Sequence, residues 1–192
     1  MGKIYYMMGK SASGKDTLYK LLMNRMPGLK RAVIHTTRPM RDGETDGVEY
    51  FFDGEEQLNE FRRQGRIIEE RTYETVMGPW TYYTVMDGQF DDGKDDILMI
   101  GTLESYAGMM KFFGGGRLVP VYIQVDGGTR LERSVRRERL QKHPNYSEIC
   151  RRFLADEEDF SEEKLGRLGI ERRFINQDMD RCADEICAMM RG

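Results

Sequence analysis

The stretch that most constrains this chain lies near its start and reads MMGKSASGKDT. After Gly9 come four residues and then the pair Gly14 and Lys15, which is the spacing of a loop that wraps around phosphate groups. An apolar run before the loop predicts a buried strand, and a helix is expected from about Lys15 to Met26. This order points backbone N–H groups and a helix N-terminus at an anion. The loop therefore predicts nucleotide binding, with Lys15 supplying positive charge to the phosphates.

Asp16 follows Lys15, where such loops normally offer serine or threonine. Two interpretations of Asp16 stay open. It is either a first-turn carboxylate, favourable beside the helix dipole by about 0.3–1 kcal/mol, or a carboxylate that approaches a magnesium ion directly or through water. Thr17 keeps a hydroxyl one position later. The residues expected to hold the donor phosphates are Gly9, Ser11, Ala12, Ser13, Gly14, Lys15, Asp16 and Thr17.

Strands and helices alternate along most of the chain. Beyond the first pair, strands are expected at 32–36, 97–101, 118–125 and 172–176, and helices at 55–64, 105–113, 128–141, 147–160 and 179–190. Alternation of this kind predicts an α/β fold with a mainly parallel sheet flanked by helices. Shorter strands cluster at 48–52, 66–69 and on both sides of Gly78–Pro79. They interrupt the alternation, so a small β-rich subdomain is expected between 48 and 86.

Composition excludes several classes of protein. The chain has 192 residues, which favours one domain, and its 30 basic and 33 acidic residues leave a net charge of only −3. No basic tail stands apart, which argues against nucleic acid as the main partner. The three cysteines, Cys150, Cys182 and Cys187, have no metal-binding spacing and are expected to be reduced thiols. With no signal-peptide pattern and no membrane-length apolar run, we expect a soluble, cytoplasmic protein without membrane partners.

The segment HTTRPMRDGETDGVEYFF resembles the GMP-binding segment of guanylate kinases, and the resemblance extends over essentially the whole chain. The positions that fall on the family pattern are Arg38, Arg41, Glu44 and Tyr50. In that family the two arginines and the tyrosine hold the α-phosphate of the nucleotide that receives the phosphoryl group. Guanidinium groups bind phosphate in bidentate fashion and a phenol hydroxyl adds a hydrogen bond, so the chemistry agrees. Two arginines three apart on a loop are otherwise ordinary solvated charges.

The segment RIIEE resembles the family strand that ends in a guanine-reading glutamate, here Glu69. A carboxylate can accept both donors of the guanine edge, the N1–H and the 2-amino group, and adenine offers no such pair. Glu70 stands next to it, and a surface glutamate at a strand end is the alternative. In GPWTYYT, Tyr82 and Thr84 are the best matches to the family's Tyr–Gly–Ser/Thr element, with the register left open.

The segment TRLERSVRRERLQK resembles the family lid, whose arginines close over the transferring phosphoryl group. Arg133 and Arg137 have no acidic residue three or four positions away, so they repel each other unless an anion comes between them. Arg152 resembles a further lid arginine, although neighbouring carboxylates could pair with it. The segment FINQDMD resembles the end of the ATP-side strand and implies that Asn176 lies near the adenine.

The chain also departs from the family pattern. Besides Asp16, Ile34 stands where the family has a serine that contacts guanine, and Met99 and Gly101 stand where it has two aspartates. One of those aspartates normally serves the magnesium or the base. Either Asp16 restores a carboxylate near the magnesium, or the pocket has moved from guanine toward another base.

The resemblance implies a P-loop nucleoside monophosphate kinase that converts ATP and GMP to ADP and GDP by direct in-line transfer. Its implied catalytic residues are Lys15, Arg133, Arg137 and Arg152, and Mg²⁺ would accompany ATP. The alternatives are a kinase for a non-guanine monophosphate and a non-catalytic module that binds phosphorylated peptides. The implied P-loop NTPase-type domain has a core (about 1–34, 87–126 and 161–192), a β-rich monophosphate-binding subdomain (about 35–86) and a helical lid (about 127–160).

Overall fold

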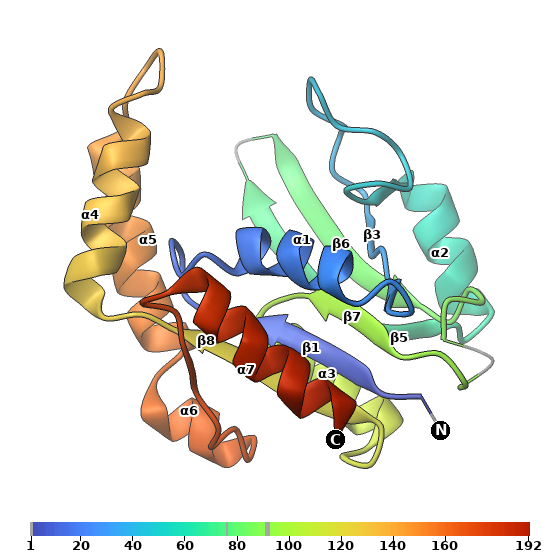
Figure 1. The fold of residues 1–192 in the computed structure, drawn as a ribbon. Helices are drawn as coiled ribbons and strands as arrows, with labels where there is room; N and C mark the ends of the chain where they lie inside the picture. The colour runs from blue at the N-terminus through green and yellow to red at the C-terminus, as the bar shows by residue number, and fades with distance from the viewer. Residues whose placement is uncertain (1, 76, 91–92) are drawn as a thin grey trace.

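The computed structural model describes residues 2–75, 77–90 and 93–192 (Figure 1). Asp91 and Asp92, which fall inside the predicted core segment 87–126, lie outside the described residues. The core is a five-stranded sheet in the order β2-β7-β1-β8-β9, and every pairing in it is parallel. Its strands are β1 (Ile4–Met8), β2 (Lys30–Arg31), β7 (Ile97–Ile100), β8 (Leu118–Gln124) and β9 (Phe174–Ile175).

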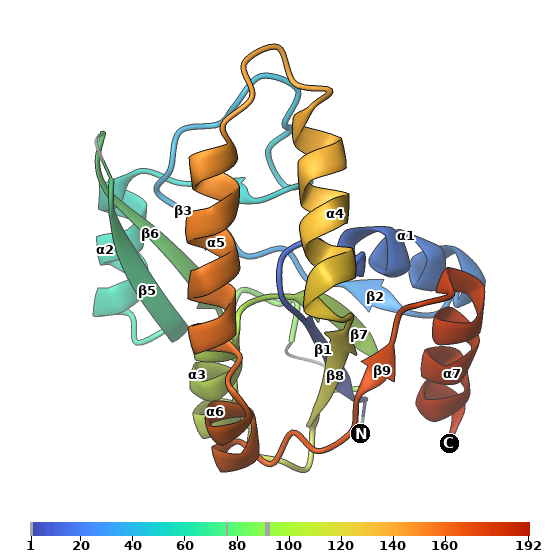
Figure 2. The same ribbon diagram turned by 90° about the vertical axis from the view of Figure 1, so that its left-hand side faces the viewer.

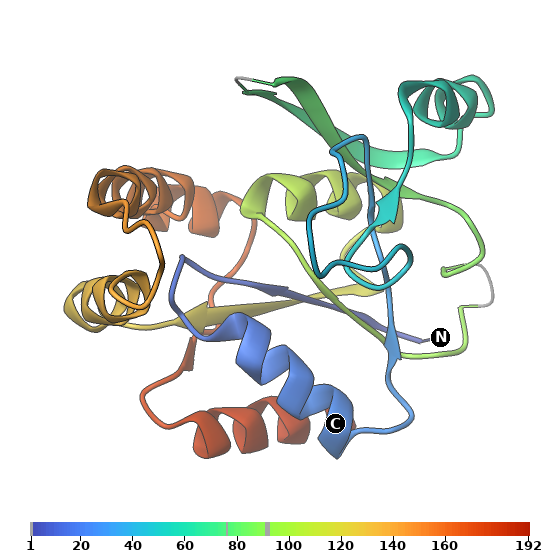
Figure 3. The ribbon, with the colours of Figure 1, turned by 90° about the horizontal axis from the view of Figure 1, so that it is seen from above.

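Helices cover both faces of this sheet (Figures 1 and 3). They are α1 (Lys15–Arg25) and α7 (Met179–Arg191) on one face, and α3 (Leu103–Phe113) with α6 (Glu162–Arg167) on the other. Side chains of β1 alternate between the faces, so Tyr5 and Met7 pack with α1 and α7 while Tyr6 and Met8 pack with α3. A strand buried on both faces must be apolar throughout, as β1 is. The predicted α/β fold class with a parallel sheet is confirmed.

A second, four-stranded sheet has the order β4-β3-β6-β5. It comprises β3 (His35–Thr36), β4 (Phe51–Phe52), β5 (Ile67–Thr75) and β6 (Gly78–Val85), and α2 (Glu55–Arg63) packs on it. The β5–β6 hairpin is antiparallel and much longer than the short strands expected around Gly78–Pro79. Threonine and aromatic residues along both strands favour this extension.

The strand predicted over 32–36 is confirmed only at His35–Thr36, because the chain changes sheets in this region. Lys30 and Arg31 pair with β7 of the core sheet, whereas His35 and Thr36 pair with the second sheet. Between them, the side-chain amide of Gln89 replaces a neighbouring strand: its oxygen accepts from Val33 N at 2.7 Å and its nitrogen donates to Val33 O at 3.0 Å. A local apolar pattern cannot reveal which sheet each residue joins.

Two helices, α4 (Gly127–Glu138) and α5 (Tyr146–Asp159), stand side by side and project away from the core sheet (Figure 2). Both begin with a side-chain cap: Asp126 accepts from Thr129 N at 2.9 Å and Asn145 accepts from Glu148 N at 3.1 Å. The short helix α6 was not predicted. Across the described residues, no helix combines the length and the apolar character needed to cross a membrane.

Candidate functional site

The phosphate-type loop connects the end of β1 to the start of α1, as the sequence predicts. Gly14 has a φ of +83°, and a Cβ built on it would lie 2.6 Å from Nδ2 of Asn176. Only glycine fits both constraints. Ala12 has a φ of +61° and is the one non-glycine residue with a positive φ among the described residues. Holding alanine in the left-handed region costs roughly 1–2 kcal/mol, so contacts from elsewhere must keep the loop curled.

Those contacts come from three elements. Asn176, which follows β9, donates from Nδ2 to Ser13 O at 2.7 Å. Asp156 of α5 accepts from Ser11 N at 2.6 Å, and Arg133 of α4 donates to Ala12 O at 3.5 Å. Asn176 is buried and its amide faces the loop, so its observed contact is with the backbone of the loop itself. Its predicted place near the adenine stays a prediction.

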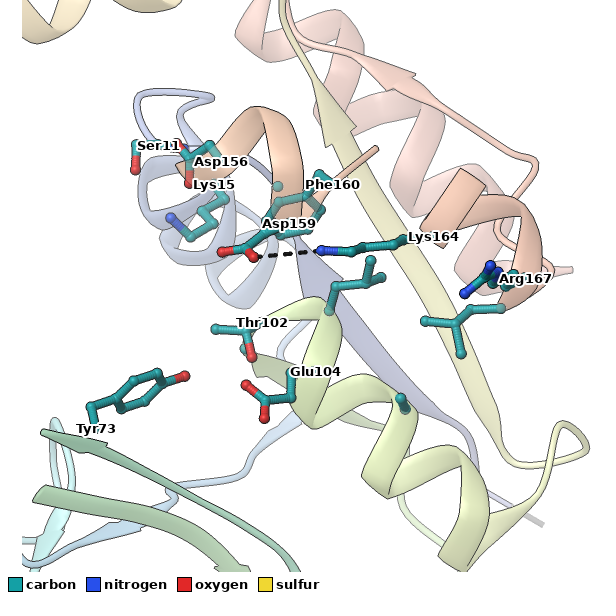
Figure 4. A pocket seen from close by; sticks show the side chains of 15 residues that line it. Ser11, Lys15, Tyr73, Thr102, Glu104, Asp156, Asp159, Phe160, Lys164 and Arg167 are labelled. Carbon is teal, nitrogen blue, oxygen red and sulfur yellow. Dashed lines mark hydrogen bonds and ion pairs between the residues drawn. The ribbon is translucent and has the colours of Figure 1, made fainter. Parts of the chain in front are cut away.

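The side chain of Lys15 lines a cavity of about 660 Å³ (Figure 4). Within the described residues its ammonium group makes no hydrogen bond or ion pair. The walls come from the loop, from β5, from the start of α3 and from the end of α5 with α6; they include Ser11, Tyr73, Gly101, Thr102, Glu104, Asp156, Asp159, Phe160 and Lys164. An unpaired cation beside curled backbone N–H groups suits an anionic ligand.

Magnesium would find few protein ligands here. The described residues hold no group of three or more His, Cys, Asp or Glu side chains arranged to bind a metal. Mg²⁺ is usually held by one or two carboxylates together with substrate phosphates, so the donor set fits an ion that arrives with a nucleotide. Asp16 is exposed in the first turn of α1 with Thr17 beside it, while Glu104 lines the cavity itself. Both interpretations of Asp16 stay predictions.

Of the adjacent glutamates, Glu69 faces inward and Glu70 outward. Glu69 is 9 % exposed, and its two oxygens accept from Arg71 Nη1 and Thr84 Oγ1, each at 2.7 Å. Glu70 is exposed and pairs with Arg62. Gly108 of α3 lets β5 approach closely, since a Cβ there would lie 2.5 Å from the Cβ of Glu69.

The hairpin also gives the register that the sequence left open. Thr84 lies opposite Glu69, and Tyr82 lies opposite Arg71. The ring of Tyr82 packs edge-on against that of Tyr50 at 5.6 Å between centroids. Three predicted acceptor residues, Glu69, Tyr82 and Thr84, therefore share one face of the hairpin, and a fourth, Tyr50, packs against Tyr82.

Arg38 is buried and binds Glu44 in bidentate fashion at 2.9 and 2.7 Å. Its guanidinium lies over the rings of Tyr50 and Phe52, 5.2 Å from each centroid. Hydrogen bonds from Arg38 and from the backbone of Arg41 lower the pKa of Glu44 to about 2. The Arg41 side chain is exposed and makes no ion pair among the described residues. Glu44 thus orients one of the two arginines predicted to bind phosphate, and the side chain of the other has no ion pair among the described residues.

The structure gives a physical reason for Gly101. A Cβ at this position would overlap the hydroxyl of Tyr6, which hydrogen-bonds to Ser105. The tyrosine on β1 therefore fills the space that a larger side chain at 101 would need. Ile34 packs against the apolar core, and Met99 is fully buried in it. Ile34 and Met99 thus pack in or against the core, and Gly101 lines the cavity without a side chain.

The predicted lid arginines are placed unequally. Arg133 reaches the loop and also donates to Asn176 O at 3.3 Å. Arg137 and Arg152 line a small crevice between α4 and α5, where Arg152 pairs with Glu148 at 3.4 Å. Sequence reasoning missed Arg130, which is 2 % exposed and contacts Ser11 O at 3.4 Å. Nothing in a charged helix segment distinguishes a buried arginine from a solvated one.

Both the sequence and the fold resemble those of known proteins. A family model described as guanylate kinase matches residues 1–102. A guanylate kinase of Legionella pneumophila is 43% identical over 68 residues, which cover 35% of this chain and 32% of the relative. One from Caldanaerobacter subterraneus is 27% identical over 98% of this chain and 86% of its own length.

The first relatives are thus matched over only about a third of their length. Among solved structures, the crystal structure of guanylate kinase from Anaplasma phagocytophilum matches with a TM-score of 0.66 and 21% identity, covering 99% of this chain and 85% of that one. At this identity the structural match supports the fold.

Proposed function

Because the chain belongs to the guanylate kinase family, we propose that it transfers the γ-phosphoryl group of ATP to GMP, giving ADP and GDP. The observation that carries the proposal is Lys15, whose ammonium group has no partner among the described residues and which lines a cavity with walls that include Tyr73, four residues along β5 from Glu69. The cavity thus extends from the phosphate loop to β5, the strand that carries Glu69. Direct phosphoryl transfer needs this arrangement, since positioning and charge stabilisation supply nearly all of its catalysis.

On the donor side, the loop N–H groups and Lys15 bind the phosphates of ATP. Mg²⁺ would supply charge neutralisation there, held by the phosphates and by an oxygen ligand such as Asp16 or Thr17. Arg133 already reaches the loop, so it needs only a side-chain movement to contact a γ-phosphate. Arg137 and Arg152 approach as the lid, residues 127–160, closes on the core. Their positive charge stabilises the moving phosphoryl group.

On the acceptor side, Arg38, Arg41, Tyr50 and Tyr82 bind the phosphate of GMP within the subdomain of residues 35–86. Each oxygen of Glu69 accepts one hydrogen bond from the protein and keeps a free lone pair. The two oxygens can therefore still accept the N1–H and 2-amino groups of guanine. Arg71 and Thr84 hold that carboxylate in place. The reaction would run in the cytoplasm, where both nucleotides are available.

A second acceptor is the main alternative, and one observation favours it. Gly101 lines the cavity without a side chain, and Ile34 carries no polar group, so these positions offer the base fewer hydrogen-bonding groups than the family residues would. Losing one buried hydrogen bond is worth about 0.5–1.5 kcal/mol, which weakens guanine recognition without abolishing it while Glu69 remains. The phosphopeptide-binding alternative is less well supported, because Lys15 and the lid arginines are all present.

A coupled assay of ADP release with ATP·Mg²⁺ tests the proposal against GMP, dGMP, AMP, CMP, UMP and TMP. We expect turnover with GMP and none with AMP, CMP, UMP or TMP. Turnover with a different monophosphate would change the assigned acceptor nucleotide but leave the proposed mechanism unchanged. A protein that binds ATP yet turns over none of the six would contradict the proposed kinase activity.

A further inference from the structure

Residues 10–12 of the phosphate loop contact the start of α4 and the end of α5, the two helices of the predicted lid. On α5, Asp156 accepts from Ser11 N at 2.6 Å and Glu157 pairs with Lys10 at 2.7 Å. On α4, Arg130 donates to Ser11 O at 3.4 Å. Both backbone groups of one loop residue are therefore bound by side chains more than 100 positions away. No part of this contact was visible in the loop motif.

Arg130 joins the two lid helices at this point. Its guanidinium pairs with Asp156 at 3.6 Å and with Glu157, and it lies over the ring of Phe153 at 4.7 Å from the centroid. The side chain is 2 % exposed. A buried charge is costly without its partners, so Arg130 and Asp156 each depend on the other to stay in place.

The conformation of the loop explains why it needs these contacts, which we call the clamp: those of Asp156 and Arg130 with the backbone of Ser11. Loops of this kind use glycine freely because the backbone curls through left-handed conformations, and here Ala12 adopts a φ of +61°. Its Cβ disfavours that conformation, so the ligand-free loop would gain by relaxing to another shape. Contacts on Ser11, immediately before Ala12, oppose that relaxation.

We propose that Asp156 and Arg130 are positioning residues for the donor-phosphate loop, holding Ser11 so that Ala12 stays in the curled conformation that phosphate binding requires. Asp156 also lines the cavity, but the role proposed here is to hold the loop and not to contact the nucleotide. The proposal rests on the proposed function only in taking the loop to bind the phosphates of ATP. Its distinctive consequence is a dependence on the residue at position 12, because glycine adopts the same conformation without help.

The test compares Asp156→Ala in two backgrounds, the natural Ala12 and Ala12→Gly. Glu158→Ala is the matched control, since Glu158 is exposed on the same helix and makes no side-chain hydrogen bond or ion pair among the described residues. Asp156→Asn keeps an oxygen that can accept from Ser11 N and removes the charge that pairs with Arg130. Amide hydrogen exchange of Ser11 and Ala12 in the ligand-free protein reports loop order, and calorimetry reports the Kd for ATP·Mg²⁺.

With Ala12 present, Asp156→Ala is expected to speed exchange of the two amides and to raise the Kd for ATP·Mg²⁺ about tenfold or more, as for a lost charged hydrogen bond. In the Ala12→Gly background Asp156→Ala should raise the Kd for ATP·Mg²⁺ only about threefold or less, because glycine adopts the left-handed conformation without strain. Asp156→Asn should fall between, and Glu158→Ala should leave both measurements unchanged.

An equal effect of Asp156→Ala in both backgrounds would overturn the proposal, and so would unchanged exchange of Ser11 and Ala12. A general loss of stability would appear as faster exchange throughout the core sheet and would equally count against a local clamp. If the unmodified protein fails to bind ATP, the proposed function is wrong. The hydrogen-exchange comparison needs no nucleotide, so it still tests whether Asp156 and Arg130 hold the loop.

Discussion

The donor side and the acceptor side of the candidate site are organised in opposite ways. On the donor side, groups from α4, α5 and the end of β9 hold the backbone of the loop, and Lys15 is left without a partner among the described residues. On the acceptor side, the predicted ligand-binding residues bind each other: Arg38 with Glu44, and Glu69 with Arg71 and Thr84.

The difference concerns what a ligand must displace. A phosphate that meets Lys15 and the loop adds interactions to groups already in position, so little reorganisation is needed. A base that meets Glu69 joins a hydrogen-bonded cluster that is complete without it. Recognition there depends on how well the base uses the remaining lone pairs. We therefore expect donor-side changes to act on rate and acceptor-side changes to act on selectivity.

The largest effect is expected for Lys15→Ala. The change removes a positive charge from the cavity wall and should lower kcat about 100-fold or more, as for other lost charge-stabilising groups. The rate of ADP release at saturating nucleotide measures it. Lys20→Ala is the control, because Lys20 is exposed on the same helix. A Lys15→Ala protein with most of its activity would contradict both the donor assignment and the contrast between the two sides.

The next effect is expected on the acceptor side, for Glu69→Gln. The amide replaces one acceptor by a donor and leaves the buried Arg71 without its counter-charge, so the KM for GMP should rise about 10- to 100-fold. The KM for ATP should not change. Glu70→Gln is the matched control, because the neighbouring side chain is exposed and pairs only with Arg62 among the described residues. Equal effects from the two variants would remove Glu69 from the acceptor site.

A smaller effect is expected for Thr84→Val, which keeps the shape and deletes one hydroxyl. Glu69 loses one neutral hydrogen-bond donor, worth about 0.5–1.5 kcal/mol, so the KM for GMP should rise about 2- to 10-fold. The rate at saturating GMP should stay near that of the unmodified protein. A large fall in kcat with an unchanged KM would show that Thr84 acts on the transfer step, and the separation into rate and selectivity would then be wrong.

The sequence predicted local features well and distant juxtapositions poorly. The loop from Gly9 to Lys15 and the parallel sheet follow from neighbouring residues and their periodicity, and the alternation of strands and helices reflects the same local rules. The split of the strand predicted over 32–36 depends on the amide of Gln89, more than fifty residues away.

The same limit applies inside the candidate site. The reason for glycine at 101 is the hydroxyl of Tyr6, and the importance of Arg130 depends on Asp156 and on the backbone of Ser11. In the sequence Arg130 stands among many charged residues, and only packing distinguishes it from a solvated one. The resemblance pointed to Glu69, but only the two faces of β5 show that Glu69 is buried and Glu70 exposed.

The smallest expected effect is a pH dependence confined to the acceptor side. His35, at the start of the second sheet, is buried, with Asp53 at 2.5 Å from Nδ1 and Asp87 at 3.1 Å from Nε2. The hydroxyl of Tyr83 also donates to Asp53, at 2.6 Å. Burial lowers the pKa of His35, but hydrogen bonds and attraction to the two carboxylates raise it by more, so the net shift is upward.

A raised pKa in the folded state means that His35 contributes stability that is fully present below about pH 6.5, its ordinary pKa, and is lost as the pH rises through the folded value. The melting temperature should therefore fall by a few degrees from pH 6 to pH 9, and His35→Gln should flatten this dependence. Hydrogen exchange can locate it: protection should decrease in β3 and β6, while the loop residues 10–13 keep theirs. Equal loss of protection in the loop and in β3 and β6 would mean that the donor and acceptor sides unfold together. The contrast between the two sides would then not extend to their free energies of unfolding.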